Sequence, residues 1–475
     1  MRKGSWRLAL GAVWTALALA ASVGITAQEA VLPTPPTQSV AGIWEGTLHA
    51  DGHSLRVVFH VAQAPSGTLS ATMDSPDQGV TGIPASSVSF EKSKLHIEIE
   101  AAHITYFAEM AKGGTLQGTW SQNGATLPLD LHRAASAPAM SRPQEPKPPF
   151  PYQVREVTYP GGAPGVTLAG TLTLPQGKGP FPAVLLLAGS GPADRDETIL
   201  GHKPFLVLAD FLTRQGLAVL RFDKRGVGQS TGDLAKATDD DYTKDALAGL
   251  AFLRSRKEVN PKAVGLIGHS EGAIEAVRAA DLSPNVAFIV LLGGPGLPGA
   301  QIIEDQVAAM DKAAGASPEQ VAKAVAVEKQ FLSIVRSQPD DAKASAEIRQ
   351  LLGKEEPRLK GAALDGQIQM ATSPGYRRFI AYDPRPDIAK VKCPVLALGG
   401  EKDLQVPAME NLLAIRAALQ KGGNQRYTVK MLPGLNHLFQ QASTGLPTEY
   451  GQIAQTFSPD ALKLIGSWIL QQVEK

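Results

Sequence analysis

Residues 263–280, AVGLIGHSEGAIEAVRAA, decide the fold of this chain. The apolar run 263–267 is typical of a buried strand, and a helical apolar pattern begins at Glu271. Between them lies Gly268-His269-Ser270-Glu271-Gly272, a G-x-S-x-G turn in the strand–turn–helix context that exposes a serine nucleophile. The glycines let the helix pass close to the strand, and the free N–H groups of its first turn can stabilise an oxyanion. Ser270 is therefore the predicted nucleophile.

A second G-x-S-x-G match, Gly228-Gln229-Ser230-Thr231-Gly232, lies several residues beyond the apolar run 218–222. Turn-forming residues surround it, and no apolar helical pattern begins at Ser230. We interpret Ser230 as a loop residue.

From Tyr152 onward, predicted strands and helices alternate, which indicates crossover units and a mostly parallel sheet covered on both faces. The first two strands follow one another directly, so we expect the sheet to open with an antiparallel pair. The predicted strands are 153–158, 166–174, 182–188, 218–222, 263–267, 286–292, 395–398 and 427–431. The predicted helices between and after them are 205–214, 241–256, 409–419 and 459–473.

A serine nucleophile needs a histidine base and a carboxylate that holds the base in one tautomer. His437 follows the last predicted strand and completes the order serine, acid, histidine that this architecture favours, whereas His202 and His269 do not. The loop after 395–398 offers two acids, Glu401 and Asp403. We predict Asp403, because two further loop residues let its shorter side chain reach over the sheet edge, and Glu401 is the alternative.

An oxyanion hole needs two backbone N–H groups. One is predicted at Glu271, directly after the nucleophile, and the other at Ser190 in the turn that follows strand 182–188. Glycines on both sides of Ser190 let that backbone turn inward. We expect the charged residues 194–196 to hold this loop by charge pairing.

The rest of the chain predicts a small second domain and a leader. Basic residues, the apolar run 8–23 and the sequence Ile-Thr-Ala before Gln28 are typical of a cleaved signal peptide, residues 1–27. A linker, 28–39, precedes residues 40–133, where period-two alternation predicts a small antiparallel β sandwich or barrel. The proline-rich residues 134–151 form a second linker, and residues 152–475 form the α/β domain. Residues 297–385, four predicted helices, interrupt that domain as a helical lid or, alternatively, a peripheral decoration.

Charge and cysteine content exclude several functions. The formal net charge is +1 without a basic block, so no nucleic acid partner is expected, and no stable membrane insertion is expected after signal cleavage. The single cysteine, Cys393, allows no internal disulfide and no cysteine-based metal site. Six histidines in residues 40–133 lack ligand-like spacing, so no metal or cofactor is predicted.

Five segments together resemble the α/β-hydrolase superfamily: AGSGPADRDET, RFDKRGVGQSTGD, GLIGHSEGA, CPVLALGGEKDLQVP and PGLNHLFQ, in this order. They are most similar to bacterial two-domain esterases of the EstD type, which are related to serine aminopeptidase-like hydrolases. The β-rich segment, with GIWEGTL, MDSPDQG and GTWSQ, also resembles the N-terminal domain of such esterases. The resemblance implies Ser270, Asp403 and His437 as the triad. Ala188 departs from the pattern, because many relatives have histidine there.

We therefore expect an α/β-hydrolase fold with a helical lid, preceded by a small antiparallel β domain. The expected function is a serine carboxylesterase that acts on small-molecule esters without a cofactor, in a bacterial periplasm or secreted. A serine exopeptidase with the same triad is the alternative, and a non-catalytic binding protein is an alternative of another class. The sequence gives no oligomeric state.

Overall fold

The computed structural model describes residues 39–50, 53–64, 66–78, 80–122, 125–135, 141–357 and 359–473. They fall into two compact units. The C-terminal unit contains Pro143–Thr198 and the residues from Lys203 onward, and the N-terminal unit contains the described residues up to Arg142 together with Ile199–His202. The predicted signal peptide, 1–27, and all but Ser39 of the first predicted linker lie outside the described residues. Within the described ranges, none of the helices has the length and apolar character that crossing a bilayer requires.

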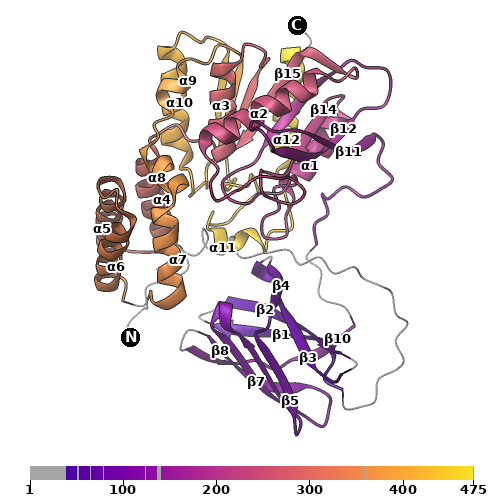
Figure 1. Cartoon of the computed structure of the whole chain (residues 1–475), viewed down its shortest axis with the longest axis vertical. Coiled ribbons are helices and arrows are strands. Elements are labelled where there is room, and N and C mark those ends of the chain that lie inside the picture. Colours follow the sequence, from indigo (N-terminus) through magenta and orange to yellow (C-terminus); the bar gives the residue numbers. More distant parts are fainter. Residues whose placement is uncertain are drawn as a thin grey trace. The chain divides into compact units, whose positions relative to one another are not determined.

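The N-terminal unit consists of two five-stranded antiparallel sheets, which confirms the predicted antiparallel β domain (Figure 1). Trp44 and Phe59 of the first sheet share a buried core with Ile97, Tyr106 and Trp120 of the second. The first sheet has the order β10 (His132–Ala134), β1 (Gly42–Ala50), β2 (His53–Gln63), β3 (Leu69–Ser75) and β4 (Val80–Pro84). The second has the order β5 (Ser87–Glu91), β6 (Lys94–Ile99), β7 (Ile104–Met110), β8 (Leu116–Gln122) and β9 (Ala125–Pro128). Strand β10 includes Ala134, which the sequence placed in the second linker.

The C-terminal unit is built on one eight-stranded sheet of the order β11-β12-β14-β13-β15-β16-β17-β18. Strand β12 pairs antiparallel with both β11 and β14, and every other pair is parallel. This topology confirms the predicted α/β-hydrolase fold and its antiparallel opening. The strands are β11 (Gln153–Pro160), β12 (Thr167–Leu174), β13 (Phe181–Leu187), β14 (Ala218–Phe222), β15 (Val259–His269), β16 (Ile289–Leu292), β17 (Val395–Gly400) and β18 (Tyr427–Leu432).

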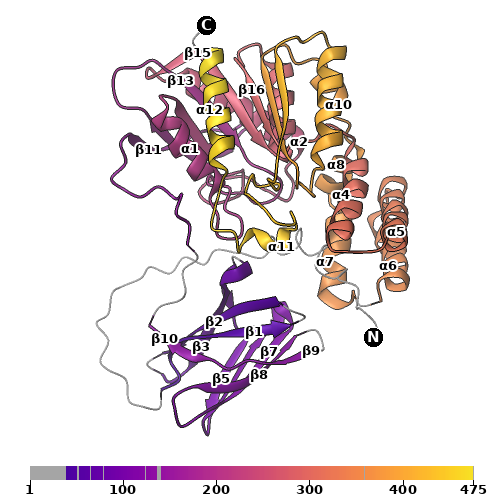
Figure 2. The same ribbon diagram turned by 180° about the vertical axis from the view of Figure 1, so that it is seen from behind.

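Helices cover both faces of this sheet, so its strands are apolar on both sides. Alternate residues of β13 face opposite ways: Leu185 belongs to the core beneath α2, α3 and α10, and Leu186 to the core beneath α1 and α12. Figure 1 shows the first face and Figure 2 the second. These helices are α1 (Pro204–Arg214), α2 (Asp239–Arg254), α3 (Glu271–Leu282), α10 (Ala408–Lys421) and α12 (Pro459–Val473). The short helices α9 (Arg385–Ile388) and α11 (Pro447–Tyr450) complete the unit.

Among the described residues, the insertion between β16 and α9 contains five helices, one more than predicted, and has an apolar core of its own. The additional helix is α8 (Pro374–Ala381). It is short, and its Pro-Gly start and paired arginines hid it in the sequence, although the Ser373 hydroxyl caps it by accepting from the Tyr376 N–H. The other four are α4 (Gly299–Ala313), α5 (Pro318–Ser337), α6 (Asp341–Glu355) and α7 (Gly361–Thr372).

Candidate active site

Ser270 lies in the sharp turn between β15 and α3. Its backbone angles, φ 54° and ψ −121°, are ones that residues other than glycine rarely adopt. The two glycines of the motif make this turn feasible by removing side chains. A Cβ on Gly268 would lie 2.1 Å from the Gly272 carbonyl oxygen, and a Cβ on Gly272 would lie 2.1 Å from the Leu187 carbonyl oxygen. The Ser270 N–H donates to the Leu292 carbonyl at 2.8 Å, which fixes the turn at the carboxyl end of the sheet.

His437 and Asp403 form a buried hydrogen-bonded pair at the same edge. Asp403 follows β17, His437 follows β18, and the Nδ1–Oδ2 distance is 2.8 Å. The other Asp403 oxygen accepts the backbone N–H groups of Gln405 and Val406, at 3.0 and 2.8 Å, so the carboxylate is fixed from both sides. Glu401 instead accepts the Gly434 N–H at 2.9 Å. The structure therefore brings His437 together with Asp403 and leaves its Nε2 for another partner.

Two neighbours of the Ser270 turn contact His437. The ring of His269 lies 4.8 Å from the ring of His437, centroid to centroid. Gly293 follows the carbonyl that binds the Ser270 N–H, and a Cβ on it would lie 3.1 Å from His437 Nδ1 and 3.3 Å from Asp403 Oδ2. The serine turn and the His437–Asp403 pair therefore meet around Gly293, where a side chain would press on both members of the pair.

The loop after β13 reaches the same place. A Cβ on Gly189 would lie 3.3 Å from the Ser270 Cβ, so this backbone passes directly over the serine. The Gly189 N–H is occupied, since it donates to the Glu197 carboxylate at 2.6 Å. Within the described residues, the N–H groups of Ser190 and Glu271 have no recorded acceptor. These are the two groups predicted to bind an oxyanion.

Charge pairing holds this loop, as the sequence indicated. Arg195 makes a two-pronged contact with Asp223, at 3.1 and 2.8 Å, and also pairs with Glu156. Asp196 pairs with Arg221. These contacts fix the loop from strands β11 and β14, away from the serine.

A sequence profile described as "Serine aminopeptidase, S33" matches residues 203–441, just over half of the chain. The chain belongs to this family of α/β-hydrolases. The matched region spans the turn of Ser270 as well as Asp403 and His437.

Individual relatives of this α/β-hydrolase match over shorter stretches. Esterase EstD of Thermotoga maritima is 35% identical over 159 residues, 34% of this chain and 36% of the relative. The 2,6-dihydropseudooxynicotine hydrolase of Paenarthrobacter nicotinovorans is 27% identical over 27% of this chain and 33% of the relative. The match thus spans about a third of the length of these relatives. Among solved structures, Est1E from Butyrivibrio proteoclasticus with bound ferulic acid has a TM-score of 0.39 and 15% identity, over 67% of this chain and all of Est1E.

Ser230, the serine of the second motif, has a structural place in this hydrolase. It is buried in the loop after β14, where its hydroxyl donates to the Asp223 carbonyl at 2.7 Å and accepts the Ala169 N–H at 2.9 Å. Both contacts tie the loop to the sheet, which agrees with its interpretation as a loop residue.

His269 is a site residue whose role the sequence analysis missed. Its Nδ1 lies 2.9 Å from a Glu197 oxygen and its Nε2 lies 3.0 Å from the His437 carbonyl oxygen. Both partners only accept, so the imidazole satisfies both when it is protonated on both nitrogens. Burial lowers the pKa of His269, but the charge and hydrogen bond of Glu197 outweigh burial and raise the pKa above its usual value. His269 therefore links the serine turn to the backbone of His437, and the neighbouring Glu197 favours its protonated form.

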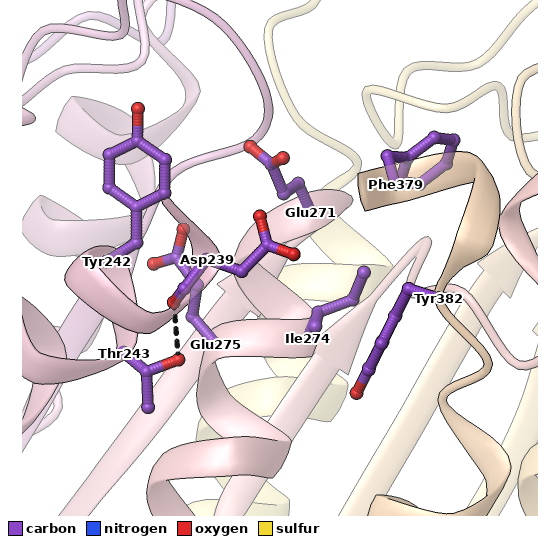
Figure 3. Close-up of a pocket in the computed structure, with 8 residues that line it drawn as sticks. All are labelled: Asp239, Tyr242, Thr243, Glu271, Ile274, Glu275, Phe379 and Tyr382. Atoms are coloured by element: carbon purple, nitrogen blue, oxygen red, sulfur yellow. Dashed lines mark hydrogen bonds between the residues drawn. The ribbon is translucent and has the colours of Figure 1, made fainter. Parts of the chain in front are cut away.

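An acidic pocket lies beside the serine turn, along the first turns of α2 and α3 (Figure 3). Its carboxylates are Asp239, Glu271 and Glu275, and the insertion contributes Phe379 and Tyr382. Burial, and next the charge of Glu271, raise the pKa of Asp239, and burial raises the pKa of Glu275 to about 8. Glu275 Oε1 is buried and has no hydrogen-bond partner among the described residues. The insertion thus reaches a pocket lined by carboxyl groups that starts one residue from Ser270.

The described residues contain no group of three or more His, Cys, Asp or Glu side chains arranged to hold a metal ion. In the N-terminal unit, histidines have separate partners: His60 pairs with Asp74, and His132 pairs with Glu45.

Proposed function

We propose that this protein is a serine carboxylesterase that uses Ser270, His437 and Asp403 through an acyl-enzyme. The observation that carries the proposal is the convergence at Gly293 of a strained serine turn and a buried histidine–carboxylate pair. Membership of the α/β-hydrolase family and the partial match to esterase EstD support it. The substrate class is a small-molecule carboxylic ester.

In this mechanism the Ser270 hydroxyl attacks the ester carbonyl while His437 Nε2 accepts its proton. Asp403 holds the Nδ1–H tautomer and stabilises the imidazolium as it forms. The free N–H groups of Glu271 and Ser190 stabilise the oxyanion. His437 then protonates the leaving alcohol, and a water that it activates cleaves the acyl-enzyme. Apart from the ester and this water, the steps use only groups of this chain.

The test combines turnover with covalent labelling. Wild-type protein should hydrolyse p-nitrophenyl acyl esters, and a fluorophosphonate probe should label Ser270 stoichiometrically. Ser270→Ala should abolish labelling and lower kcat by roughly 10⁴- to 10⁶-fold, while Ser230→Ala should still be labelled. A wild-type protein that neither turns over esters nor reacts with the probe would instead favour the non-catalytic binding protein.

The acidic pocket favours a second candidate, an exopeptidase that uses the same triad. Asp239 and Glu271 suit a free amino group close to the scissile bond, because opposite charges attract strongly where water is partly excluded. A comparison of p-nitrophenyl esters with aminoacyl anilides separates the candidates. A higher kcat/KM for the anilides would replace the esterase proposal, and an acyl chain-length series would define the ester substrate.

We further propose that the chain is exported and loses residues 1–27. The basic start and the apolar run before Gln28 support this proposal. The intact mass of protein recovered from a bacterial periplasm or medium should correspond to a chain that starts at Gln28. Recovery of the full-length chain from the cytoplasm alone would contradict it.

A further inference from the structure

Lys224 is a buried cation that touches both sides of the proposed oxyanion hole. It follows strand β14 and is 3% exposed. Its Nζ donates to the Gly189 carbonyl oxygen at 2.7 Å and to the Glu271 carboxylate at 3.2 Å. The same ammonium lies 4.6 Å from the centre of the Tyr242 ring. One side chain thus joins the loop after β13 to the residue that follows Ser270.

The contact with Gly189 acts on a particular peptide bond. The Gly189 carbonyl and the Ser190 N–H belong to the same planar peptide unit and point in opposite directions when that unit is trans. An ammonium bonded to the carbonyl therefore fixes the direction of the N–H. It also strengthens that N–H as a donor, because hydrogen bonds in a chain polarise one another.

The contact with Glu271 acts through charge. Glu271 places a carboxylate on the residue whose N–H is to bind an oxyanion, and that negative charge opposes the charge of the transition state. The Lys224 ammonium, 3.2 Å away, offsets it. Burial lowers the pKa of Lys224, but Glu271 and Glu275 outweigh burial and hold the pKa above its usual value, so the lysine stays charged. Figure 3 shows Glu271, Glu275 and Tyr242 around the pocket.

We propose that Lys224 is a positioning residue for ester hydrolysis, which orients and polarises the Ser190 N–H and neutralises Glu271 beside the oxyanion. The inference rests on the proposed function. Lys224 does not touch substrate, and its effect reaches the transition state through the Gly189–Ser190 peptide.

The test begins with Lys224→Met, which keeps the length of the side chain and removes the donor and the charge. Loss of one oxyanion donor costs about 10²- to 10³-fold in kcat, so weakening one through Lys224 should cost about 10- to 100-fold, with KM changed by less than about threefold. The rate of labelling of Ser270 by the fluorophosphonate probe should fall in parallel, because the probe also forms an oxyanion-like centre.

Arg225 provides the matched control. It is the next residue of the same loop, 5% exposed, and pairs with the buried Asp245 at 2.7 Å. Arg225→Met should lower the midpoint of thermal unfolding, as Lys224→Met should, while kcat below that midpoint stays within about threefold of wild type. A merely structural role of Lys224 would give the two variants the same kinetics.

A charge-balanced double variant tests the second half of the proposal and remains informative if Lys224→Met fails to fold. In Lys224→Met/Glu271→Gln the uncovered carboxylate is absent, so kcat should recover about 3- to 10-fold relative to Lys224→Met. Whether or not Lys224→Met folds, the kcat of the double variant should remain below that of Glu271→Gln alone, because the Gly189 carbonyl still lacks its ammonium.

The outcomes that overturn the inference differ from those that overturn the esterase. The role of Lys224 is refuted if folded Lys224→Met has a kcat within about threefold of wild type, while Ser270 remains essential. It is also refuted if the double variant has a kcat within about threefold of Glu271→Gln. Wild-type activity that survives Ser270→Ala refutes the proposed function itself.

Discussion

At the scale of single residues, two buried carboxylates of this site have different partners. Asp403 contacts His437 with one oxygen and accepts two backbone N–H groups with the other. Glu197, held at a φ of 52°, uses one oxygen to bind both the Gly189 N–H and the His269 ring. The Glu197 side chain thus ties the loop after β13 to the serine turn.

The pair Asp403 and Glu401 gives the sharpest test of the acid. Asp403→Asn should lower kcat by about 10⁴-fold, because the amide favours the wrong tautomer of His437. Glu401→Gln should keep kcat within about threefold, since the Gln oxygen can still accept the Gly434 N–H. Steady-state kinetics on p-nitrophenyl esters measures both, and equal losses in the two variants would contradict the assignment.

The Glu197–His269 pair predicts a pH dependence of stability. The pKa of His269 is raised in the folded state, so the ion pair stabilises fully below the unfolded pKa of about 6.5 and is lost as pH rises through the folded value. We expect the free energy of unfolding of wild type to fall as pH rises through the folded pKa, beyond any change in Glu197→Gln. Denaturant titrations from about pH 6 to about pH 9 measure the difference. Parallel pH profiles for the two proteins would refute it.

At the scale of elements, the closeness of α3 to the sheet decides where Ser270 lies. Gly272 lies so near β13 that no side chain fits between helix and strand. The N-terminus of α3 therefore sits against the Gly189 loop, and the free N–H of Glu271 lies beside the serine. The hydrogen bond from Ser270 to Leu292 adds a link to β16.

Substitution of helix glycines separates this close approach from helix propensity. Gly272→Ala should destabilise the protein by about 3 kcal/mol, because its Cβ meets backbone that cannot move without shifting β13. Gly353→Ala is the control, since Gly353 lies inside α6 with nothing within 4 Å of an added Cβ. That control should stabilise by about 0.5–1 kcal/mol through helix propensity. Thermal unfolding measures both stabilities. A Gly272→Ala variant at least as stable as wild type would contradict the packing argument.

At the scale of the whole molecule, the two units have separate apolar cores. The sandwich core gathers around Trp44 and Tyr106, and the cores of the other unit lie on the two faces of the eight-stranded sheet. Units with independent cores can unfold independently. The proposed triad residues, Ser270, Asp403 and His437, all belong to the C-terminal unit.

Trp44→Ala should therefore act on one unit only. Trp44 is fully buried, and its removal should destabilise the sandwich by about 3–5 kcal/mol. Calorimetry should show two transitions, of which the variant shifts one, and kcat should stay unchanged below the shifted transition. A single transition that moves as a whole would show that the units unfold together.

Much of the fold was readable because strand and helix patterns are local. The predicted strand 218–222 and helix 459–473 match β14 and α12 residue for residue. Strand β15 begins at Val259, before the predicted start at residue 263, because Asn260-Pro261 resembles a turn in the sequence. The sheet accommodates these residues with a register shift in the pairing of β15 with Phe181 and Ala183. Helix α8 was missed because it is short and is stabilised by the packing of Ile380 in the core of the insertion, a tertiary contact that the local sequence pattern does not show.

The sequence by itself determined the order of elements, the serine on its tight turn, and the loops that carry an acid and a histidine, because these depend on residue type and spacing. Only the tertiary structure decided that Asp403 and not Glu401 meets His437, that His269 is held between Glu197 and the His437 carbonyl, and that Lys224 lies under the Gly189 peptide. Each of these contacts joins loops from different strands, and their distances are set by the sheet that brings the strand ends together.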